Sequence, residues 1–399
     1  MTPFPSDGHP ALRGSLLLGL CTLTACLGSP TGKARSWPLD PAQGQVIAVA
    51  SGDVDGDGIT DLAVLEDGSA AGVYLLLGGS DLTLSQSPST FSRVAAITEL
   101  SVPAAIAIFG QPGAAGHVVV THAGGSGEKV EVFTGPSLTP GASAAVSGTP
   151  GDAQSLAWVR QTPFGPGGNF ILFNVGTDIF HVEPNALFTT TDPAFDTLPP
   201  PGAGGWGQSA FVGGSSSKGD VWVAASDAIW TGTAGSGPIN WQKRRSGSTW
   251  PAQAPLDLTG DGREAIVGLD ASNPSALCAV EPDTGDAPGC LTTTLRLPPG
   301  GAVALVSDDV TGDGVPDLIV GAAGASPVVG VLPGVHLDTV NDRILADTAL
   351  YLPGEAAGSL VVTGHFSSAP ARQILAVGGD GTIGCYQVQS GAISRCGGP

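Results

Sequence analysis

The chain alternates short apolar runs with short polar turns along most of its length. Residues 46–50, 62–65 and 73–77 are apolar runs of this kind, and Gly, Asp, Ser and Pro are frequent between them. Runs of this length, bounded by turn-forming residues, are typical of β-strands and too short for helices. The pattern therefore predicts a protein built mainly from short strands and tight turns.

Three segments of the chain resemble one another. Residues 52–64 (GDVDGDGITDLAV), 256–268 (LDLTGDGREAIVG) and 308–321 (DDVTGDGVPDLIVG) each join a polar turn to an apolar run. Their first aspartates are separated by 204 and 52 residues, which indicates a repeat of about 52 residues. Four further positions also precede an apolar run by nine residues. The seven predicted copies start at Asp53, Phe109, Gln161, Val212, Asp257, Asp309 and His365.

About four strands in each unit of this length predict a blade of a β-propeller. An α-solenoid could have a similar period, but Gly 61 and Pro 33 make long helices unfavourable. We therefore expect an all-β, seven-bladed propeller over residues 45–399. The last copy has its own strands at 359–364, 372–378, 382–388 and 391–395, so ring closure needs only a small contribution from the N-terminal segment.

The turn of the first copy has the spacing of a calcium loop. Asp53, Asp55, Asp57 and Asp61 occupy positions 1, 3, 5 and 9, and the Ile59 carbonyl occupies position 7. Calcium takes six to eight oxygen ligands, and such a turn supplies carboxylates and a carbonyl close together. We expect this loop to bind Ca²⁺.

An EF-hand begins with the same spacing but requires a bidentate Glu at position 12 and flanking helices. Position 12 is Val64 in the first copy and Val320 in the sixth, and both lie in apolar β-type runs. The loop is therefore predicted to connect two strands.

Two other copies carry related loops. The sixth offers Asp309, Thr311, Asp313, the Val315 carbonyl and Asp317. The fifth offers Asp257, Thr259, Asp261 and the Arg263 carbonyl. This loop is one residue shorter, so Glu264 lies one position before position 9, which Ala265 occupies. The sequence leaves cation binding by this fifth loop open. We expect the other four loops to be turns without an ion.

The segments 61–64 (DLAV) and 317–322 (DLIVGA), together with the turns before them, resemble FG-GAP/VCBS repeats, the blades of integrin-alpha-type seven-bladed propellers. The resemblance implies Ca²⁺ between the first two strands of a blade, and a role in adhesion or protein binding. Because four loops depart from the family pattern, ion binding there is not implied.

The N-terminus reads as an export signal. A short apolar stretch follows Arg13, and residues 23–26 (LTAC) resemble the lipobox of bacterial lipoproteins, in which the cysteine is acylated. An ordinary signal peptide is the alternative. We expect residues 1–25 to be removed, Cys26 to carry the lipid, and residues 26–44 to form a tether. In that family Leu27 after the cysteine points to the outer membrane, facing the periplasm or the surface.

Four further cysteines fall at equivalent places in two copies. Their positions predict the disulfides Cys278–Cys290 and Cys385–Cys396, each closing an outer hairpin, and an exported protein favours such pairing. Zinc binding is the rival interpretation, but the chain has no Cys-x-x-Cys motif.

Charge and motifs restrict the function. The formal net charge of −20 argues against nucleic acid as a partner. The sequence has no Gly-x-Ser-x-Gly, no His-Glu-x-x-His and no phosphate loop. We expect no enzyme but a monomeric binding or adhesion module for a protein or glycan ligand, with membrane contact through the lipid only. A polysaccharide-acting lyase or glycosidase, or a lectin, is the alternative. A lectin would want an aromatic pocket repeated between blades, whereas five of the seven tryptophans lie between 206 and 250, where they could form a binding surface or pack in the core.

Overall fold

The structure is a computed structural model. It describes residues 35–36, 44–68, 71–79, 93–97, 100–111, 114–124, 127–146, 156–159, 170–175, 178–190, 193–198, 209–214, 220–225, 228–233, 240–246, 250, 252–261, 264–270, 273, 275–281, 290–297, 302–322, 328–341, 343–351, 359–367 and 370–396. The chain divides into two compact units, Met1–Lys33 and Ala34–Pro399, and all described residues belong to the second. Cys26 and the signal sequence lie outside the described residues, as does Arg263.

The described residues are almost entirely β-structure. They form seven antiparallel sheets, which we number sheet 1 to sheet 7 in chain order, and one separate hairpin. Sheet 1 contains β2 (Val46–Gly52), β3 (Asp61–Glu66), β4 (Gly72–Leu76) and β5 (Arg93–Ala96). Sheet 2 contains β6 (Ser101–Gln111), β7 (Ala114–Gly124), β8 (Gly127–Thr134) and β9 (Thr139–Val146). Sheet 3 contains β10 (Leu156–Val159), β11 (Phe170–Val175), β12 (Asp178–Val182) and β13 (Asp196–Thr197), with α1 (Pro184–Thr189) between the last two.

The second half of the chain continues in the same way. Sheet 4 contains β14 (Ser209–Gly214), β15 (Asp220–Ala225), β16 (Ala228–Thr233) and β17 (Asn240–Ser246). Sheet 5 contains β18 (Gln253–Leu256), β19 (Ala265–Leu269), β20 (Ala276–Val280) and β21 (Leu291–Thr292). Sheet 6 contains β22 (Ala302–Asp308), β23 (Asp317–Ala322), β24 (Val328–Leu332) and β27 (Leu350–Tyr351), and the hairpin β25 (His336–Asp338) and β26 (Arg343–Leu345) precedes its last strand.

Sheet 7 draws on both ends of the described chain. It contains β28 (Leu360–Gly364), β29 (Gln373–Val377), β30 (Thr382–Gln389) and β31 (Ala392–Arg395), close to the four strands expected for the last copy. The N-terminal strand β1 (Arg35–Ser36) pairs with Ile383 and Thr382 on β30, next to the segment of β30 that pairs with β31. The N-terminal contribution to this sheet is therefore two residues long, as small as the sequence predicts.

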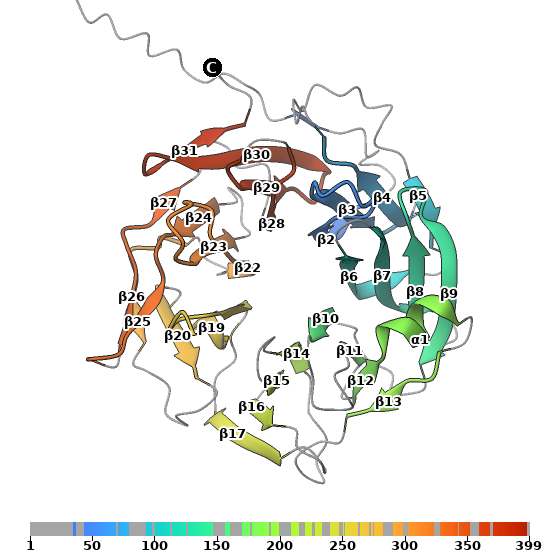
Figure 1. The fold of residues 1–399 in the computed structure, drawn as a ribbon, viewed down its shortest axis with the longest axis horizontal. Helices are drawn as coiled ribbons and strands as arrows, with labels where there is room; N and C mark the ends of the chain where they lie inside the picture. Colours follow the sequence, from blue (N-terminus) through green and yellow to red (C-terminus); the bar gives the residue numbers. More distant parts are fainter. Residues whose placement is uncertain are drawn as a thin grey trace, which may run out of the picture. The chain divides into compact units, whose positions relative to one another are not determined.

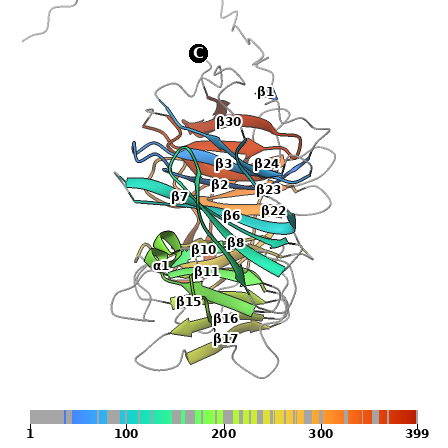
Figure 2. The ribbon, with the colours of Figure 1, turned by 90° about the vertical axis from the view of Figure 1, so that its right-hand side faces the viewer.

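The first strand of each sheet contacts the first strand of the next, and β28 of sheet 7 contacts β2 of sheet 1. Figure 1 shows the sheets in chain order around a centre, with the first strands innermost. Figure 2 shows β3 and β30 close together, and residues of sheets 1 and 7 share one apolar cluster. Similar clusters join sheet 1 to sheet 2, sheet 2 to sheet 3, sheet 4 to sheet 5, sheet 5 to sheet 6 and sheet 6 to sheet 7.

The residue patterns of the strands fit these positions. β3 and β23 are buried at every residue, because each lies inside a sheet that packs against neighbours on both faces. The outer strand β9 instead alternates exposed and buried side chains over its second half, as a strand with one solvated face does. In sheets 1 and 6 a continuously buried run therefore marks the second strand, and in sheet 2 an alternating run marks the outer edge.

The predicted starts of the copies are not all equivalent in the structure. Asp53, Asp257, Asp309 and His365 each follow directly on the first strand of their sheet. Phe109 and Val212 instead lie within β6 and β14, so the spacing placed the starts of these two copies inside a strand. Gln161 lies outside the described residues.

Both predicted disulfides are confirmed. Cys278 of β20 bonds to Cys290 with a Cα separation of 4.2 Å, and Cys385 of β30 bonds to Cys396 with a Cα separation of 5.3 Å. Each bond links the third strand of its sheet to the end of the neighbouring outer strand, so each clips an outer hairpin.

Candidate metal-binding loops

The loop between β2 and β3 brings three of its predicted ligands together. Carboxylate oxygens of Asp53, Asp55 and Asp61 lie within 4.8 Å of one another. Asp57 is exposed and does not belong to this group, and its Oδ1 accepts a hydrogen bond from the Ile59 N–H at 2.7 Å. Positions 1, 3 and 9 of the loop thus converge, and the exposed Asp57 at position 5 lies beside Asp55.

Backbone N–H groups hold the Asp53 carboxylate in place. Gly56 N donates to its Oδ1 at 2.6 Å and Gly58 N donates to its Oδ2 at 2.9 Å. Both glycines have φ of 84°, a conformation that L side chains rarely adopt. The loop can therefore wrap around one carboxylate only because glycine occupies these two positions.

Asp61 is the buried member of the group, with 1% of its surface exposed. Its Oδ2 accepts the Val54 N–H at 2.7 Å, and its Oδ1 accepts the Gly78 N–H at 2.8 Å. The pKa of this carboxyl is raised to about 7, chiefly by burial and also by the charges of Asp55 and Asp53, while its two backbone hydrogen bonds oppose the rise. Burial also raises the pKa of Asp55. Negative charge is therefore concentrated here at an electrostatic cost that a bound cation would offset.

The loop between β22 and β23 repeats this geometry. Thr311 Oγ1 lies 3.5 Å from Asp309 Oδ1 and 3.4 Å from Asp317 Oδ1, so positions 1, 3 and 9 converge again. Asp317 is fully buried, and burial raises its pKa. Asp313 at position 5 is exposed, and its Oδ1 accepts the Val315 N–H at 2.8 Å.

The position-9 carboxylates tie together the same three segments in both sheets. Asp317 Oδ2 accepts the Val310 N–H at 2.9 Å and Oδ1 accepts the Gly334 N–H at 2.9 Å. The partners lie 7 residues before and 17 residues after the aspartate in sheet 6, as in sheet 1. Sequence reasoning missed Gly78 and Gly334, although a glycine at the same offset after both Asp-Leu pairs was a visible signal.

The fifth loop lacks this central carboxylate. Asp257 Oδ1 accepts the N–H groups of Thr259 at 3.2 Å and Gly260 at 2.8 Å, so the start of the turn is conserved in shape. Ala265, which pairs with Leu256 across the sheet, occupies the place of Asp61 and Asp317. Asp261 is exposed and Glu264 is half-buried. This loop therefore keeps the turn but not the buried anchor of the other two.

Position 2 of these loops has a packing role that the sequence analysis did not recognise. Val54, Leu258 and Val310 are all buried, and each joins the apolar cluster between its own sheet and the next. The Val54 carbonyl also accepts the Gly116 N–H of sheet 2 at 2.8 Å, and the Leu258 carbonyl accepts the Leu337 N–H of the β25–β26 hairpin at 2.7 Å. The loops are therefore wedged between neighbouring sheets.

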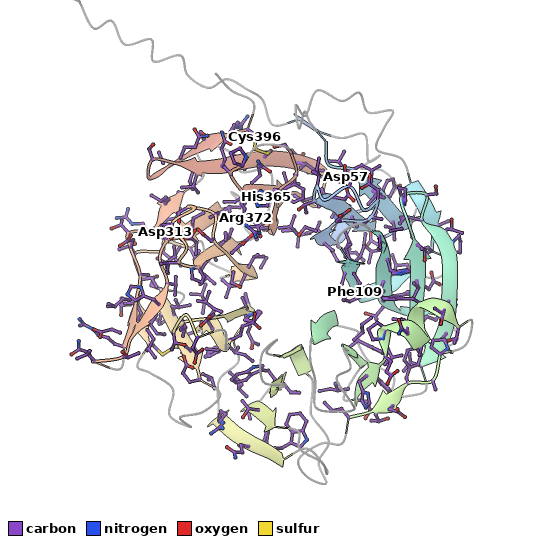
Figure 3. The ribbon with its side chains drawn as sticks, viewed as in Figure 1. Asp57, Phe109, Asp313, His365, Arg372 and Cys396 are labelled. Atoms are coloured by element: carbon purple, nitrogen blue, oxygen red, sulfur yellow. A yellow bond between two sulfur atoms is a disulfide. The ribbon has the colours of Figure 1, made fainter. Side chains whose placement is uncertain are left out.

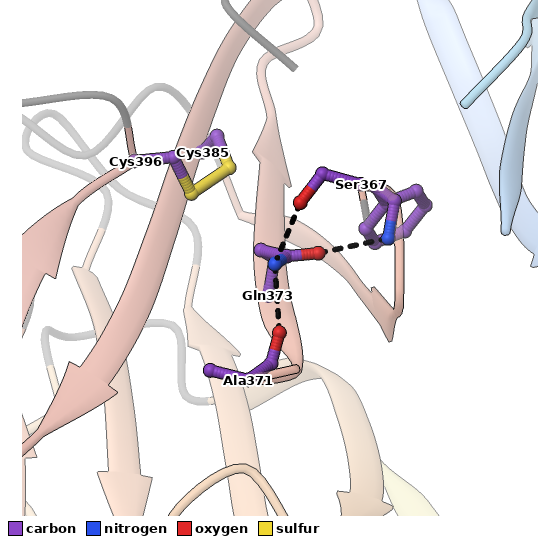
Figure 4. Close-up of a disulfide and its surroundings, with 6 residues drawn as sticks. Ser367, Ala371, Gln373, Cys385 and Cys396 are labelled. Carbon is purple, nitrogen blue, oxygen red and sulfur yellow. Dashed lines mark hydrogen bonds between the residues drawn. A yellow bond between two sulfur atoms is a disulfide. The ribbon is translucent and has the colours of Figure 1, made fainter. Parts of the chain in front are cut away.

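Sheet 7 has a loop without acidic residues in the same place, and its Arg372 forms an ion pair with Asp308 of sheet 6 at 2.6 Å. Gln373, with 2% of its surface exposed, pairs with Gly364 as Asp61 pairs with Gly52 and Asp317 with Asp308. Its Oε1 accepts the Phe366 N–H at 2.8 Å, and its Nε2 donates to Ala371 O at 2.7 Å and to Ser367 Oγ at 3.2 Å (Figure 4). Figure 3 shows His365 of this loop, Asp57 and Asp313 in three different sheets.

The five tryptophans between residues 206 and 250 do not all lie at the surface of the protein. Trp222 and Trp250 are buried in the cluster between sheets 4 and 5. Trp230 is half-buried with Lys243 Nζ 5.6 Å from its ring centroid, and Trp206 lies outside the described residues. Core packing therefore accounts for two of the five tryptophans in this part of the sequence.

The histidines on β7 lie on opposite faces, as their spacing predicts. The His117 ring stacks on Phe188 of α1 at a centroid distance of 3.9 Å, and burial lowers its pKa. His122 is fully buried with its Nε2 3.6 Å from Glu131 Oε1. The two rings therefore do not form a metal pair.

In the part of the chain that is described, no helix has the length and apolar character needed to cross a membrane.

No protein-family model and no curated protein matches this chain. Solved structures do. BBS1N in complex with ARL6DN aligns with a TM-score of 0.59 at 14% identity, over 88% of this chain and 96% of that one. A putative 6-phosphogluconolactonase from Bacteroides fragilis aligns with a TM-score of 0.50 at 12% identity, over 90% and 96% of the two chains. The Dos1 propeller aligns with a TM-score of 0.48 at 10% identity, over 86% and 81%. The nearly all-β chain, with its seven antiparallel sheets, thus shares the β-propeller fold of BBS1N and the lactonase-like protein.

Proposed function

We propose that this chain is a seven-bladed propeller of FG-GAP/VCBS-like repeats whose first and sixth loops bind Ca²⁺. The observation that carries the calcium proposal is the convergence of Asp53, Asp55 and Asp61 within 4.8 Å around a nearly buried carboxylate. Oxygen-only ligand sets with several carboxylates suit Ca²⁺, which tolerates irregular geometry better than Mg²⁺ does. The sixth loop offers the same three positions with Thr311 in place of one carboxylate.

The seven blades are the seven sheets, and the contacts between first strands support one closed ring. In this arrangement the calcium loops connect the first two strands of their blades and are wedged against the next blade. Bound ions would therefore stabilise the contacts between blades as well as the turns themselves. A rigid ring of this kind presents its connecting loops to a ligand with little loss of conformational entropy.

We infer that the protein acts as a binding or adhesion module for a protein or glycan. BBS1N, which has the same fold, was solved as a complex with another protein, ARL6DN. The runner-up is an enzyme, because the fold also occurs in a putative 6-phosphogluconolactonase. Cys26 would anchor the propeller to the bacterial outer membrane through a lipid, with residues 27–44 as the tether.

Thermal unfolding with Ca²⁺, with Mg²⁺ and with chelator tests the calcium proposal. A ligand that binds only the folded state at 100 times its Kd adds about 2.7 kcal/mol, so Ca²⁺ should raise the Tm. The double variant Asp53→Ala with Asp309→Ala should lose most of that rise. Asp380→Ala, which removes an aspartate of a turn in sheet 7, should keep it. An unchanged Tm of the wild-type protein in Ca²⁺ would contradict the proposal.

Ligand capture tests the binding role. The non-lipidated chain from residue 27 onward would be applied to a glycan array and used in pull-downs, with and without Ca²⁺. Saturable binding that the Asp53→Ala and Asp309→Ala changes weaken supports a binding module. Turnover of a polysaccharide would favour the enzyme instead. Mass spectrometry of the mature N-terminus tests acylation, which Cys26→Ser should abolish.

A further inference from the structure

The loop of sheet 7 carries an inference about how cation dependence is divided among the blades. It has the same framework as the first and sixth loops but an amide at position 9. We propose that the Gln373 side chain takes the place of the cation, so that this loop is held by hydrogen bonds and does not depend on calcium. The inference rests on the proposed calcium binding of the other two loops.

The framework is shared residue by residue. Position 9 pairs across the sheet with the residue before position 1 in all three sheets: Asp61 with Gly52, Asp317 with Asp308, and Gln373 with Gly364. Its side-chain oxygen accepts the N–H of position 2 at 2.7, 2.9 and 2.8 Å, respectively. Position 2 is buried in each, and Phe366 packs between sheets 7 and 1 as Val54 packs between sheets 1 and 2.

The difference lies at the oxygens of positions 3 and 7. In a calcium loop these positions supply a side-chain oxygen and a backbone carbonyl to the ion. In sheet 7 they are Ser367 and Ala371, and Gln373 Nε2 donates to Ser367 Oγ at 3.2 Å and to Ala371 O at 2.7 Å. Both protons of one NH₂ group therefore serve the two oxygens that an ion would otherwise hold together.

The orientation of the amide follows from its partners. The Phe366 N–H can only donate, so the atom facing it is the amide oxygen, and the Ala371 carbonyl can only accept, so the atom facing it is the amide nitrogen. Gln is also one methylene longer than Asp. The extra length carries the NH₂ group into the loop, where an aspartate would stop short and leave room for an ion.

Sheet 7 also meets the first calcium loop directly. The Thr60 N–H donates to the His365 carbonyl at 2.8 Å, and the His365 N–H donates to Thr60 Oγ1 at 3.0 Å. A cation-independent loop therefore supports one side of a cation-dependent loop.

Hydrogen exchange of the full mature protein, measured by mass spectrometry in Ca²⁺ and in chelator, tests the proposal. Peptides covering 52–62 and 308–318 should exchange at least about tenfold faster in chelator, because opening these loops then breaks no ion contacts. The peptide covering 364–374 should exchange at the same rate in both. If all three peptides exchange faster in chelator, the role proposed for Gln373 is overturned, whereas the calcium proposal stands. Acceleration of none would overturn the calcium proposal and this inference with it.

Two variants test the Gln373 amide directly, because their side chains are about as long as that of glutamine. Gln373→Met removes the amide, so peptide 364–374 should exchange faster whether or not Ca²⁺ is present. Gln373→Glu places a carboxylate against the oxygens of Ser367 and Ala371, so the same peptide should become protected by Ca²⁺ and exposed in chelator. A Gln373→Glu protein that ignores Ca²⁺ and exchanges like wild type would overturn the substitution of amide for cation. Should one variant fail to fold, the other still tests the role of the amide.

Discussion

The clearest energetic prediction concerns Asp317, the buried carboxylate at position 9 of the sixth loop. Three backbone N–H groups donate to it, from Val310, Thr311 and Gly334, at 2.8 to 2.9 Å. Asp317→Ala would leave all three without this acceptor. A buried donor without a partner costs about 1–3 kcal/mol, and the bond from Val310 is buried while the other two are part-buried.

The Val310 N–H also donates to the Asp308 carbonyl at 3.1 Å, so it keeps one acceptor in the variant. Counting about 1 kcal/mol for each of the three lost bonds gives a loss of about 3 kcal/mol. Burial raises the pKa of Asp317, so ionising this carboxyl already costs the folded state some stability in chelator. We therefore expect Asp317→Ala to lower the free energy of unfolding by about 2–3 kcal/mol.

Guanidinium unfolding at pH 8 in chelator measures this loss without a contribution from calcium. Asp313→Ala is the matched control, because it removes an exposed aspartate of the same loop whose carboxylate accepts the Val315 N–H. The control should change the free energy of unfolding by about 0.5 kcal/mol or less. If the two variants differ by less than about 1 kcal/mol, the position-9 carboxylate does not anchor the loop in the way we describe.

Three other predictions follow from local geometry. Gly78→Ala should destabilise the protein, because the new Cβ would lie 2.4 Å from the backbone oxygen of Thr60. At the neighbouring Gly79 a Cβ would meet no atom within 4 Å, so Gly79→Ala should be tolerated. Thermal melts compare the stability of the two variants. Replacing Cys385 and Cys396 by alanine should cost about 3 kcal/mol on the chain-entropy account, and denaturant unfolding would reveal a negligible loss if the bond has no role. Burial lowers the pKa of His117 from 6.5, so the stability it contributes is present above that pH and decreases as the pH falls below it. His117→Phe should therefore make stability less dependent on pH between about 7 and 5 than in wild type, and equal slopes would contradict this.

The sequence alone determined the all-β fold class of this protein and the convergence of three carboxylates in its first loop. Short apolar runs between turn residues specify strands because local backbone preference and burial act over a few residues. The spacing of Asp53, Asp55 and Asp61 predicted their convergence for the same reason, since a glycine-rich turn brings positions 1, 3 and 9 together without help from distant segments. The cysteine spacing likewise identified both disulfides, because each pair belongs to one hairpin.

Tertiary structure decided what depends on segments that are distant in sequence. Strand pairing and packing between sheets placed Phe109 and Val212 inside strands, where a fixed spacing had placed turns. The N–H groups of Gly78 and Gly334 reach the buried carboxylates only because the third strand of each sheet ends beside the loop. The sequence predicts Gln373 only as part of a strand. Strand register shows that it occupies the same position as Asp61, because Gln373 pairs with Gly364 as Asp61 pairs with Gly52. The role of its side chain is set by the atoms around it, which come from Phe366, Ser367 and Ala371.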